Sequence, residues 1–248
     1  MELLYGDEHL AVFNKPTGLL VHRTTIDRHE TSFAVQMARD LVGQRVFPVH
    51  RLDKPTSGVL LFALSPEAAR RLAGAFEAAA VRKTYLAVVR GIISDCGEVD
   101  HPLANEPDQF KGKEDSDRNV MRPAVTRYRR LATIELPVAV GRYATSRYSL
   151  AELLPLSGRR HQLRRHLKHL LHPLIGDTRY GEGRHNRFFR ETLHCRRLLL
   201  HAVELAFPHP ATGALTTVTA PLQDDFARVV ERFDWWDAIP KQWSLPGK

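Results

Sequence analysis

The sequence predicts an α+β fold in which most strands belong to one sheet. Strand-like apolar runs alternate with segments of helical period, and a strand pair is expected near each end of the chain. With 248 residues, 43% of them apolar, the chain can bury a sizeable core as one large domain or two small ones.

The first third of the chain alternates strands and helices. Residues 2–16 ("ELLYGDEHLAVFNKP") predict a strand pair broken at Gly6 and Asp7. Residues 31–43 predict a helix with Thr31 or Ser32 as its N-cap and Gly43 as its end. The stretch 46–65, "VFPVHRLDKPTSGVLLFALS", predicts a strand, a loop and a second strand.

A helix with strong start signals follows, because Ser65 can cap it and Pro66 suits its first position. Residues 82–91 ("RKTYLAVVRG") predict a strand. Residues 94–123 are rich in Pro, Gly and charge, and we expect surface loops with at most one short strand there. This stretch could link two domains, but the unfinished strand pattern on both sides favours an excursion from one sheet.

The last part of the chain predicts two strands, a basic helix and a closing hairpin. The strands are "AVTRYRRLATIEL" and "SRYSLAELLPL", and the hairpin turns at Gly213. The helix lies within residues 157–173, with leucines on one stripe and Arg160, Arg164 and Lys168 on another. The final stretch, "FDWWDAIPKQWSLPGK", gives little functional signal.

The charge indicates a polyanionic partner. The formal net charge is +8, and arginines cluster in residues 118–130, 159–168 and 179–197. Arginine binds phosphate with two hydrogen bonds and stacks on bases, so such clusters favour nucleic acid. The alternative is a basic surface that only keeps the protein in solution.

Neither membrane insertion nor secretion is expected. The sequence has no apolar run of about 18 residues and no basic-then-apolar leader at its start. Its two cysteines, Cys96 and Cys195, do not form a disulfide framework and fit a reducing compartment. We therefore expect a cytoplasmic protein.

Several kinds of active site are absent from the sequence. It contains neither of the glycine-rich phosphate-binding patterns and no GxSxG motif. "HRLD" differs from the kinase H-R-D loop by an extra leucine. His166, His169 and His172 are spaced by three, but no HExxH motif or cysteine pair accompanies them, so we expect no metal site.

One carboxylate, Asp53, stands among three potential cations, His50, Arg51 and Lys54. Nearby positive charge keeps a carboxylate ionised, and an ionised aspartate in a pocket can act as a nucleophile or a base. The alternative is an ion pair that braces the loop. Charge and periodicity alone favour that alternative.

Five segments, in the same order, resemble the motifs of the RluA-like pseudouridine synthases. They are "DEHLAVFNKPTGLLVH", "HRLDKPTSGVLLFA", "RKTYLAVVRG", "SGRRHQLRRHLKHLLHPLIGDTRYG" and "LLLHAVELAFPHPATG". The resemblance implies the catalytic fold of that family: a mixed, mostly antiparallel bent sheet flanked by helices, with a central RNA-binding cleft. It implies a catalytic domain at 1–225 and a C-terminal tail at 226–248. The sequence starts almost at the opening motif, so we expect no separate N-terminal S4-type domain, unlike in several members of the family.

The resemblance also implies an isomerase that converts uridine in RNA to pseudouridine without a cofactor or metal. Asp53 would be the catalytic aspartate, attacking the ribose, attacking the base or removing a ribose proton. Tyr85 would stack on the flipped uracil and help remove the C5 proton. Arg164 would pair with Asp53 and keep it ionised and oriented.

RNA must reach this pocket, and a uridine in a duplex must first be extruded. We expect Arg51 to fill the space that the base leaves. The expected RNA-binding residues are His50, Arg51, Lys54, Arg159, Arg160 and Arg165, with further phosphate contacts from the cluster at 118–130.

The substrate expected from the resemblance is tRNA. "ELPVAVGRYATSRYSL" and "GRRHQLRRHL" resemble the branch of the family that modifies uridine 65 of certain tRNAs. The alternatives are a ribosomal RNA substrate, or a basic RNA-binding module without catalysis in which Asp53 only braces its loop. We expect a monomer.

Overall fold

A computed structural model describes residues 1–22, 31–105 and 120–244. The strands, in chain order, are β1 (Glu2–Gly6), β2 (Leu10–Lys15), β3 (Phe47–Pro48), β4 (Ser57–Ala63), β5 (Arg82–Arg90), β6 (Cys96–Asp100), β7 (Leu103–Ala104), β8 (Met121–Arg122), β9 (Val125–Leu136), β10 (Ser146–Pro155), β11 (Leu200–Pro208) and β12 (Leu215–Thr219). The α-helices are α1 (Ala34–Val42), α2 (Pro66–Glu77), α3 (Gln162–His169), α4 (Gly183–Thr192) and α5 (Asp224–Arg232).

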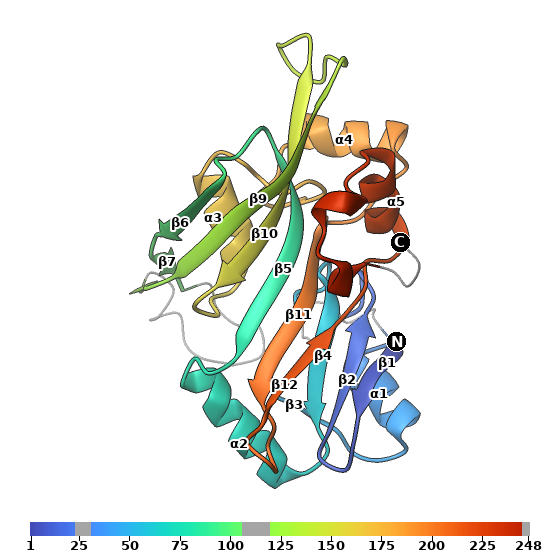
Figure 1. The fold of residues 1–248 in the computed structure, drawn as a ribbon, viewed down its shortest axis with the longest axis vertical. Helices are drawn as coiled ribbons and strands as arrows, with labels where there is room; N and C mark the ends of the chain where they lie inside the picture. Colours follow the sequence, from blue (N-terminus) through green and yellow to red (C-terminus); the bar gives the residue numbers. More distant parts are fainter. Residues whose placement is uncertain (23–30, 106–119, 245–248) are drawn as a thin grey trace.

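Ten of these strands form one mixed sheet, which confirms the predicted α+β class. Its order is β1-β2-β4-β11-β5-β10-β9-β6, with β12 paired to β11 and β3 paired to β4. All pairs are antiparallel except β4 with β11. Figure 1 shows an elongated molecule with α1 and α2 toward one end of the sheet, α4 and α5 toward the other, and the β9–β10 hairpin projecting beyond the body.

The start of α2 follows the sequence prediction. The Ser65 side chain accepts a hydrogen bond from the backbone N–H of Ala68 at 3.1 Å, and Pro66 occupies the first helical position. A capping hydroxyl satisfies one of the N–H groups that the first turn leaves without a helical partner. The helix therefore begins where the local chemistry predicts.

The predicted cap of α1 is wrong, although its predicted end at Gly43 is confirmed. The N-cap is Phe33, and no side chain caps the helix. Instead, the N–H groups of Ala34 and Val35 donate to the carbonyls of residues 20 and 21 at 2.8 and 3.1 Å. The first-turn donors are thus satisfied by another part of the backbone, so a capping hydroxyl is not needed. Gly43 ends the helix in the left-handed conformation that glycine adopts easily.

The parallel pairing of β4 with β11 draws the loop before β4 to the middle of the sheet. Gly58 on β4 lies opposite Ala202 on β11. A Cβ atom at Gly58 would meet the Ala202 carbonyl oxygen at 2.1 Å, and the φ angle of Gly58 is +111°. Both facts require glycine here, and they set the position of the loop 49–56.

The described residues of the segment 94–123 belong to two sheets. Its strand β6 pairs with β9 in the main sheet, and β7 pairs with β8 in a separate two-stranded sheet. The described residues of this segment therefore form three short strands, β6, β7 and β8, where at most one was expected. Residues 106–119 lie outside the described residues, so the predicted contribution of Arg118 does too.

The C-terminal segment contributes to the main core. Helix α5 runs across the predicted boundary at residue 225, and Phe226, Trp235 and Trp243 are buried. The indole N–H of Trp243 donates to Glu204 on β11 at 3.1 Å. The described part of the segment thus packs against the sheet. Within the described ranges, no helix is long and apolar enough to cross a membrane.

Candidate active site

Asp53 lies in the loop 49–56 between β3 and β4, and backbone hydrogen bonds fix this loop. The N–H of Thr56 donates to the Asp53 carbonyl at 3.0 Å, and the N–H of Gly18 donates to the Lys54 carbonyl at 2.9 Å. The Asp53 side chain is 21% exposed. The carboxylate is therefore held in place, mostly enclosed, and still open to a ligand.

A buried lysine that the sequence did not single out supports the same loop. Lys15, the last residue of β2, is fully buried. Its Nζ donates to three backbone carbonyls, at Pro16 (2.9 Å), Leu19 (2.7 Å) and Lys54 (3.2 Å). Burial, and to a lesser extent the charge of Arg197, lower the pKa of Lys15 to about 7, although the charge of Asp53 acts in the opposite direction. The sequence offered one indication of this role, because Lys15 stands in the "NKP" of the opening motif.

Arg164 on α3 contacts Asp53 directly. Its Nη1 donates to Oδ2 of Asp53 at 3.3 Å, and its side chain is 6% exposed. The structure thus brings together the two residues that the sequence analysis expected to pair. Arg164 points into the protein and does not belong to an outer basic stripe.

Asp177, which the sequence analysis missed, holds Arg164 from the other side. Its two carboxylate oxygens accept from Nε and Nη2 of Arg164 at 2.7 and 2.9 Å, and its side chain is fully buried. Burial alone would raise the pKa of Asp177, but the hydrogen bonds and charge of Arg164 keep it below its ordinary value. One guanidinium therefore joins two carboxylates, and the buried one fixes its direction.

Tyr85 on β5 completes the expected trio. Burial raises the pKa of its phenol, and the negative charge of Asp53 raises it further. The hydroxyl thus stays protonated at neutral pH. A neutral, half-buried phenol beside the carboxylate suits stacking and hydrogen bonding better than it suits a strong base.

His50 is used inside the fold. Its Nε2 accepts the backbone N–H of Leu61 at 2.9 Å, and its ring stacks on Phe76 with centroids 5.1 Å apart. Burial lowers its pKa to about 3, with a smaller contribution from Lys83. The imidazole is therefore neutral and braces the loop of Asp53 against β4 and α2.

The other expected RNA contacts differ in how available they are. Arg51 and Arg159 are exposed, although Nε of Arg159 also donates to the Pro123 carbonyl at 3.1 Å. Arg165 is half-buried and donates to the Ala104 carbonyl on β7 at 2.9 Å. The remaining two, Lys54 and Arg160, are half-buried.

Three arginines of the 118–130 cluster are paired with acids on or beside neighbouring strands. These pairs are Arg127 with Glu98, Arg129 with Glu152, and Arg130 with Asp95. Each pair reduces the positive charge that the arginine offers to phosphate. The strand β9 is therefore a weaker phosphate-binding surface than its sequence indicates.

All three evenly spaced histidines contact other groups of the fold, and the ring of His169 stacks on that of His101 with centroids 3.9 Å apart. His166 is buried, with its ring nitrogens 2.9 Å from the Thr126 hydroxyl and 3.1 Å from the His101 carbonyl. Nδ1 of His172 lies 2.8 Å from the Arg90 carbonyl oxygen. In the parts of the chain that the structure describes, no group of three or more metal-binding side chains gathers.

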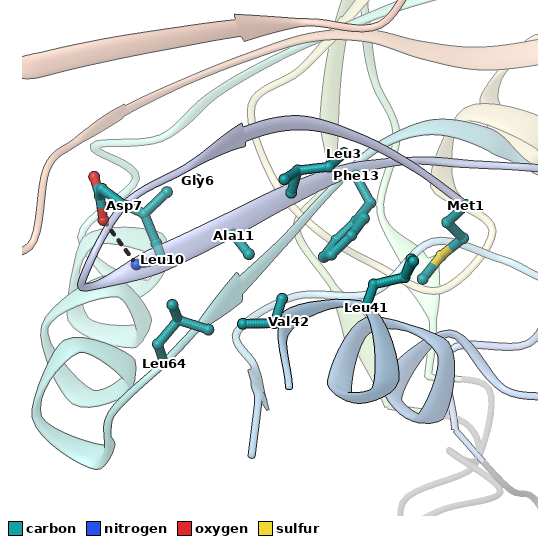
Figure 2. A pocket seen from close by; sticks show the side chains of 10 residues that line it. All are labelled: Met1, Leu3, Gly6, Asp7, Leu10, Ala11, Phe13, Leu41, Val42 and Leu64. Atoms are coloured by element: carbon teal, nitrogen blue, oxygen red, sulfur yellow. Dashed lines mark hydrogen bonds between the residues drawn. The ribbon is translucent and has the colours of Figure 1, made fainter. Parts of the chain in front are cut away.

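A pocket elsewhere on the molecule does not contain the site. It lies between β1, β2 and α1, and Figure 2 shows a mostly apolar lining that includes Leu3, Phe13 and Leu41. Its one carboxylate, Asp7, accepts the backbone N–H of Leu10 at 3.0 Å. None of the residues gathered around Asp53 lines it, so the convergent charged groups around Asp53 define the candidate site.

Comparison with known proteins agrees with this geometry. The family model described as "RNA pseudouridylate synthase" matches residues 9–169, which include Asp53, Tyr85 and Arg164. A protein named "tRNA pseudouridine synthase C" from Vibrio cholerae is 47% identical over 96% of this chain and 98% of its own length. One of the same name from Pectobacterium carotovorum is 50% identical over 97% of this chain, which spans 64% of that relative.

Solved structures show the same fold. "Human RNA Pseudouridylate Synthase Domain Containing 4" superposes with a TM-score of 0.70 at 26% identity, covering 94% of this chain and 93% of that one. "Human RNA Pseudouridylate Synthase Domain Containing 1" gives 0.67, also at 26% identity, with 94% of each chain covered. The matched family model, the relatives and the fold agree, and the chain belongs to the RNA pseudouridylate synthase family.

Proposed function

We propose that this protein isomerises a specific uridine of tRNA to pseudouridine, and that uridine 65 is the target. The observation that supports it most is the Asp53 carboxylate, partly exposed and 3.3 Å from the buried Arg164. Relatives named tRNA pseudouridine synthase C, at 46–50% identity over nearly the whole chain, support tRNA as the substrate. Position 65 follows from the resemblance of residues 135–150 to that branch.

In the proposed reaction, the bond between uracil and ribose breaks and the base is rejoined through C5. Asp53 acts in its ionised form, by attack on the ribose, attack on the base or removal of a ribose proton. Arg164 donates a hydrogen bond to the carboxylate and fixes its direction. Tyr85 stacks on the extruded base as a neutral phenol. No cofactor or metal takes part.

RNA approaches over the exposed arginines beside the pocket. Arg51 is two residues from Asp53 and exposed, so it is placed to enter the space that an extruded base leaves. Arg159, two residues before His161, and the half-buried Arg160 are placed to meet the backbone phosphates. Lys54 and Arg165 add positive charge nearby. His50, being neutral, supports the loop.

We further propose that the protein works in the cytoplasm as a monomer. We also propose that residues 226–244 are part of the catalytic domain and not a separate tail. Burial of Trp235 and Trp243 in the main core supports the last statement. Light scattering of the purified protein checks the oligomeric state. A mass of two chains would contradict the monomer.

The proposed activity is tested with RNA transcripts tritiated at C5 of uracil, because joining the base through C5 releases that tritium. Transcripts of tRNA and of ribosomal RNA fragments are compared, and Asp53→Asn is the control. We expect release from tRNA by the wild type alone, and loss of that release when uridine 65 is replaced by cytidine. Binding without release would contradict the isomerase. Release from ribosomal RNA alone would contradict the tRNA substrate.

A further inference from the structure

His161, immediately before α3, lies between Asp53 and a tyrosine. Its Nε2 lies 3.8 Å from Oδ2 of Asp53, and its side chain is 11% exposed. Its Nδ1 lies 3.0 Å from the hydroxyl of Tyr180. Each ring nitrogen therefore faces one partner.

This arrangement selects one form of the imidazole. An ionised carboxylate can only accept, so the Asp53 carboxylate beside Nε2 favours the proton of the neutral ring on that nitrogen. Nδ1 is then the acceptor, and the Tyr180 hydroxyl donates to it. The distance of 3.8 Å is longer than a hydrogen bond, and contacts of this kind commonly shorten when the substrate binds.

Two groups converge on the same carboxylate oxygen. Oδ2 of Asp53 faces both Nε2 of His161 and Nη1 of Arg164, the latter at 3.3 Å. When the His161 contact shortens, two donors from different directions restrict rotation of the carboxylate more than one donor does. With Oδ2 engaged by both groups, Oδ1 is the oxygen left for the substrate.

Both groups depend on one turn of the chain. Oδ1 of Asp177 accepts the N–H groups of Arg179 and Tyr180, both at 2.9 Å, while the same carboxylate binds Arg164. The Arg164 guanidinium also lies over the Tyr180 ring, 5.2 Å from its centre. The turn at 177–180 therefore anchors the arginine and the tyrosine together.

The backbone of His161 adds an independent observation. Its φ angle is +53°, in the left-handed region that non-glycine residues rarely adopt. Backbone strain of this kind persists where the surroundings enforce it and clusters at functional sites. His161 is the N-cap of α3, and with this backbone conformation its imidazole faces Asp53.

We infer that His161 and Tyr180 form a positioning pair for Asp53: the Tyr180 hydroxyl fixes the imidazole, and Nε2 of His161 holds Oδ2 of the carboxylate. This inference rests on the proposed isomerase activity. Both residues act through Asp53, so they should affect the rate of the reacting complex and leave RNA binding unchanged.

Two substitutions of His161 separate the two ring nitrogens. In His161→Gln, the side chain is long enough to place an amide N–H near the position of Nε2. In His161→Asn, it is one methylene shorter and reaches Tyr180 without reaching Asp53, and asparagine tolerates the left-handed backbone. Tritium release should show kcat lowered about 10-fold in the Asn variant, with KM unchanged and most of kcat retained in the Gln variant.

The tyrosine has a matched control in the same chain. Tyr180→Phe removes the hydroxyl that faces Nδ1 of His161, whereas Tyr148→Phe removes a hydroxyl 2.8 Å from Nδ1 of His185 in the core around α4. We expect kcat to fall in the first variant and to stay at the wild-type value in the second. Adding Tyr180→Phe to His161→Asn should cause no further loss, because the two residues act as one unit.

The outcomes distinguish this inference from the proposed function. No tritium release by the wild type would contradict the isomerase itself. Release by the wild type, with equal kcat in wild type, His161→Asn and Tyr180→Phe, would contradict the positioning pair alone. A rise in KM at constant kcat would also contradict it, because that result indicates an RNA contact.

Discussion

Asp177 and Arg164 form a two-bonded ion pair inside the protein, and the remaining nitrogen of the same guanidinium reaches Asp53. The three donor–acceptor distances are 2.7, 2.9 and 3.3 Å. A planar guanidinium fixed along one edge by a carboxylate can turn very little. The direction from which Asp53 is contacted is thus set by a residue that does not touch it.

Removing the buried carboxylate should cost both stability and activity. Asp177→Asn leaves Arg164 buried with a weaker partner, and losing one member of a buried pair costs about 3 kcal/mol. We expect a drop of that size in the free energy of unfolding, measured with urea. At temperatures where the variant is folded, kcat for tritium release should also fall.

An exposed pair of the same chemistry gives the control. Glu67 and Arg71 on α2 are 2.7 Å apart, and both side chains are more than half exposed. Because water screens such pairs, Glu67→Gln should change the free energy of unfolding by less than about 1 kcal/mol. Equal effects of Glu67→Gln and Asp177→Asn would mean that the buried pair does not stabilise the site.

Stability should fall as the pH drops below neutrality, because two histidines are held neutral. Burial lowers the pKa of His50 and of His201 from 6.5 to about 3. The unfolded chain takes up a proton at each near pH 6.5, whereas the folded chain does not until about pH 3. The neutral histidines therefore contribute fully to stability above about pH 6.5, and this contribution decreases as the pH falls from about 6.5 toward about 3.

The test compares the wild type with His50→Gln, whose amide can still accept the N–H of Leu61. Urea unfolding is measured between about pH 7.5 and about pH 5, within the window where a histidine titrates when unfolded. We expect the wild type to lose more free energy of unfolding over this range than the variant. Parallel curves would show that His50 is not held neutral.

Substitutions of Tyr85 should separate the contribution of its ring to RNA binding from that of its hydroxyl. Tyr85→Phe keeps the ring, so we expect unchanged affinity for tRNA in filter binding. Tyr85→Ala removes the ring and should weaken binding by about 1–3 kcal/mol, as expected for loss of one stacked base. A large loss of affinity in the Phe variant would instead assign the binding role to the hydroxyl.

The salt dependence of binding should distinguish available from paired arginines. Arg159 is exposed beside the site, whereas Arg129 is 2.6 Å from Glu152. In a plot of the logarithm of the tRNA-binding constant against the logarithm of the salt concentration, Arg159→Ala should reduce the slope by about one. Arg129→Ala should reduce it less. The reverse order would mean that β9 is the main phosphate-binding surface.

Arg51 should matter most where the base must be extruded from a helix. We expect Arg51→Ala to slow modification of a uridine in a duplex stem more than modification of the same uridine in an unpaired strand. The measurement is tritium release from two matched transcripts. Equal slowing of both would contradict a role in filling the space left by the base.

The sequence predicts what local chemistry or an ordered set of motifs can report. Ser65 and Pro66 start α2 as expected, because capping depends on neighbours in the chain. Asp53 and Arg164 are 111 residues apart in sequence and lie together in the structure. Their pairing was expected because the motifs in which they stand resemble those of the family. The family resemblance supplied that long-range information.

Residues whose roles depend on distant partners were missed or misplaced. Phe33 begins α1 because another loop supplies the carbonyls. Arg129 is paired because the register of β9 with β10 sets Glu152 opposite it. Asp177 and His161 stand in the arginine motif, yet nothing in their spacing shows that they face Arg164 and Asp53. Such contacts arise from the packing of the sheet and helices.

The central claim is that the Asp53 carboxylate performs the isomerisation of a tRNA uridine. The most direct measurement is a single-turnover assay of tritium release from C5-labelled tRNA with excess enzyme, wild type against Asp53→Asn. We predict one tritium released per tRNA by the wild type, and no release by a variant that still binds tRNA. Release by Asp53→Asn at the wild-type rate would contradict the account.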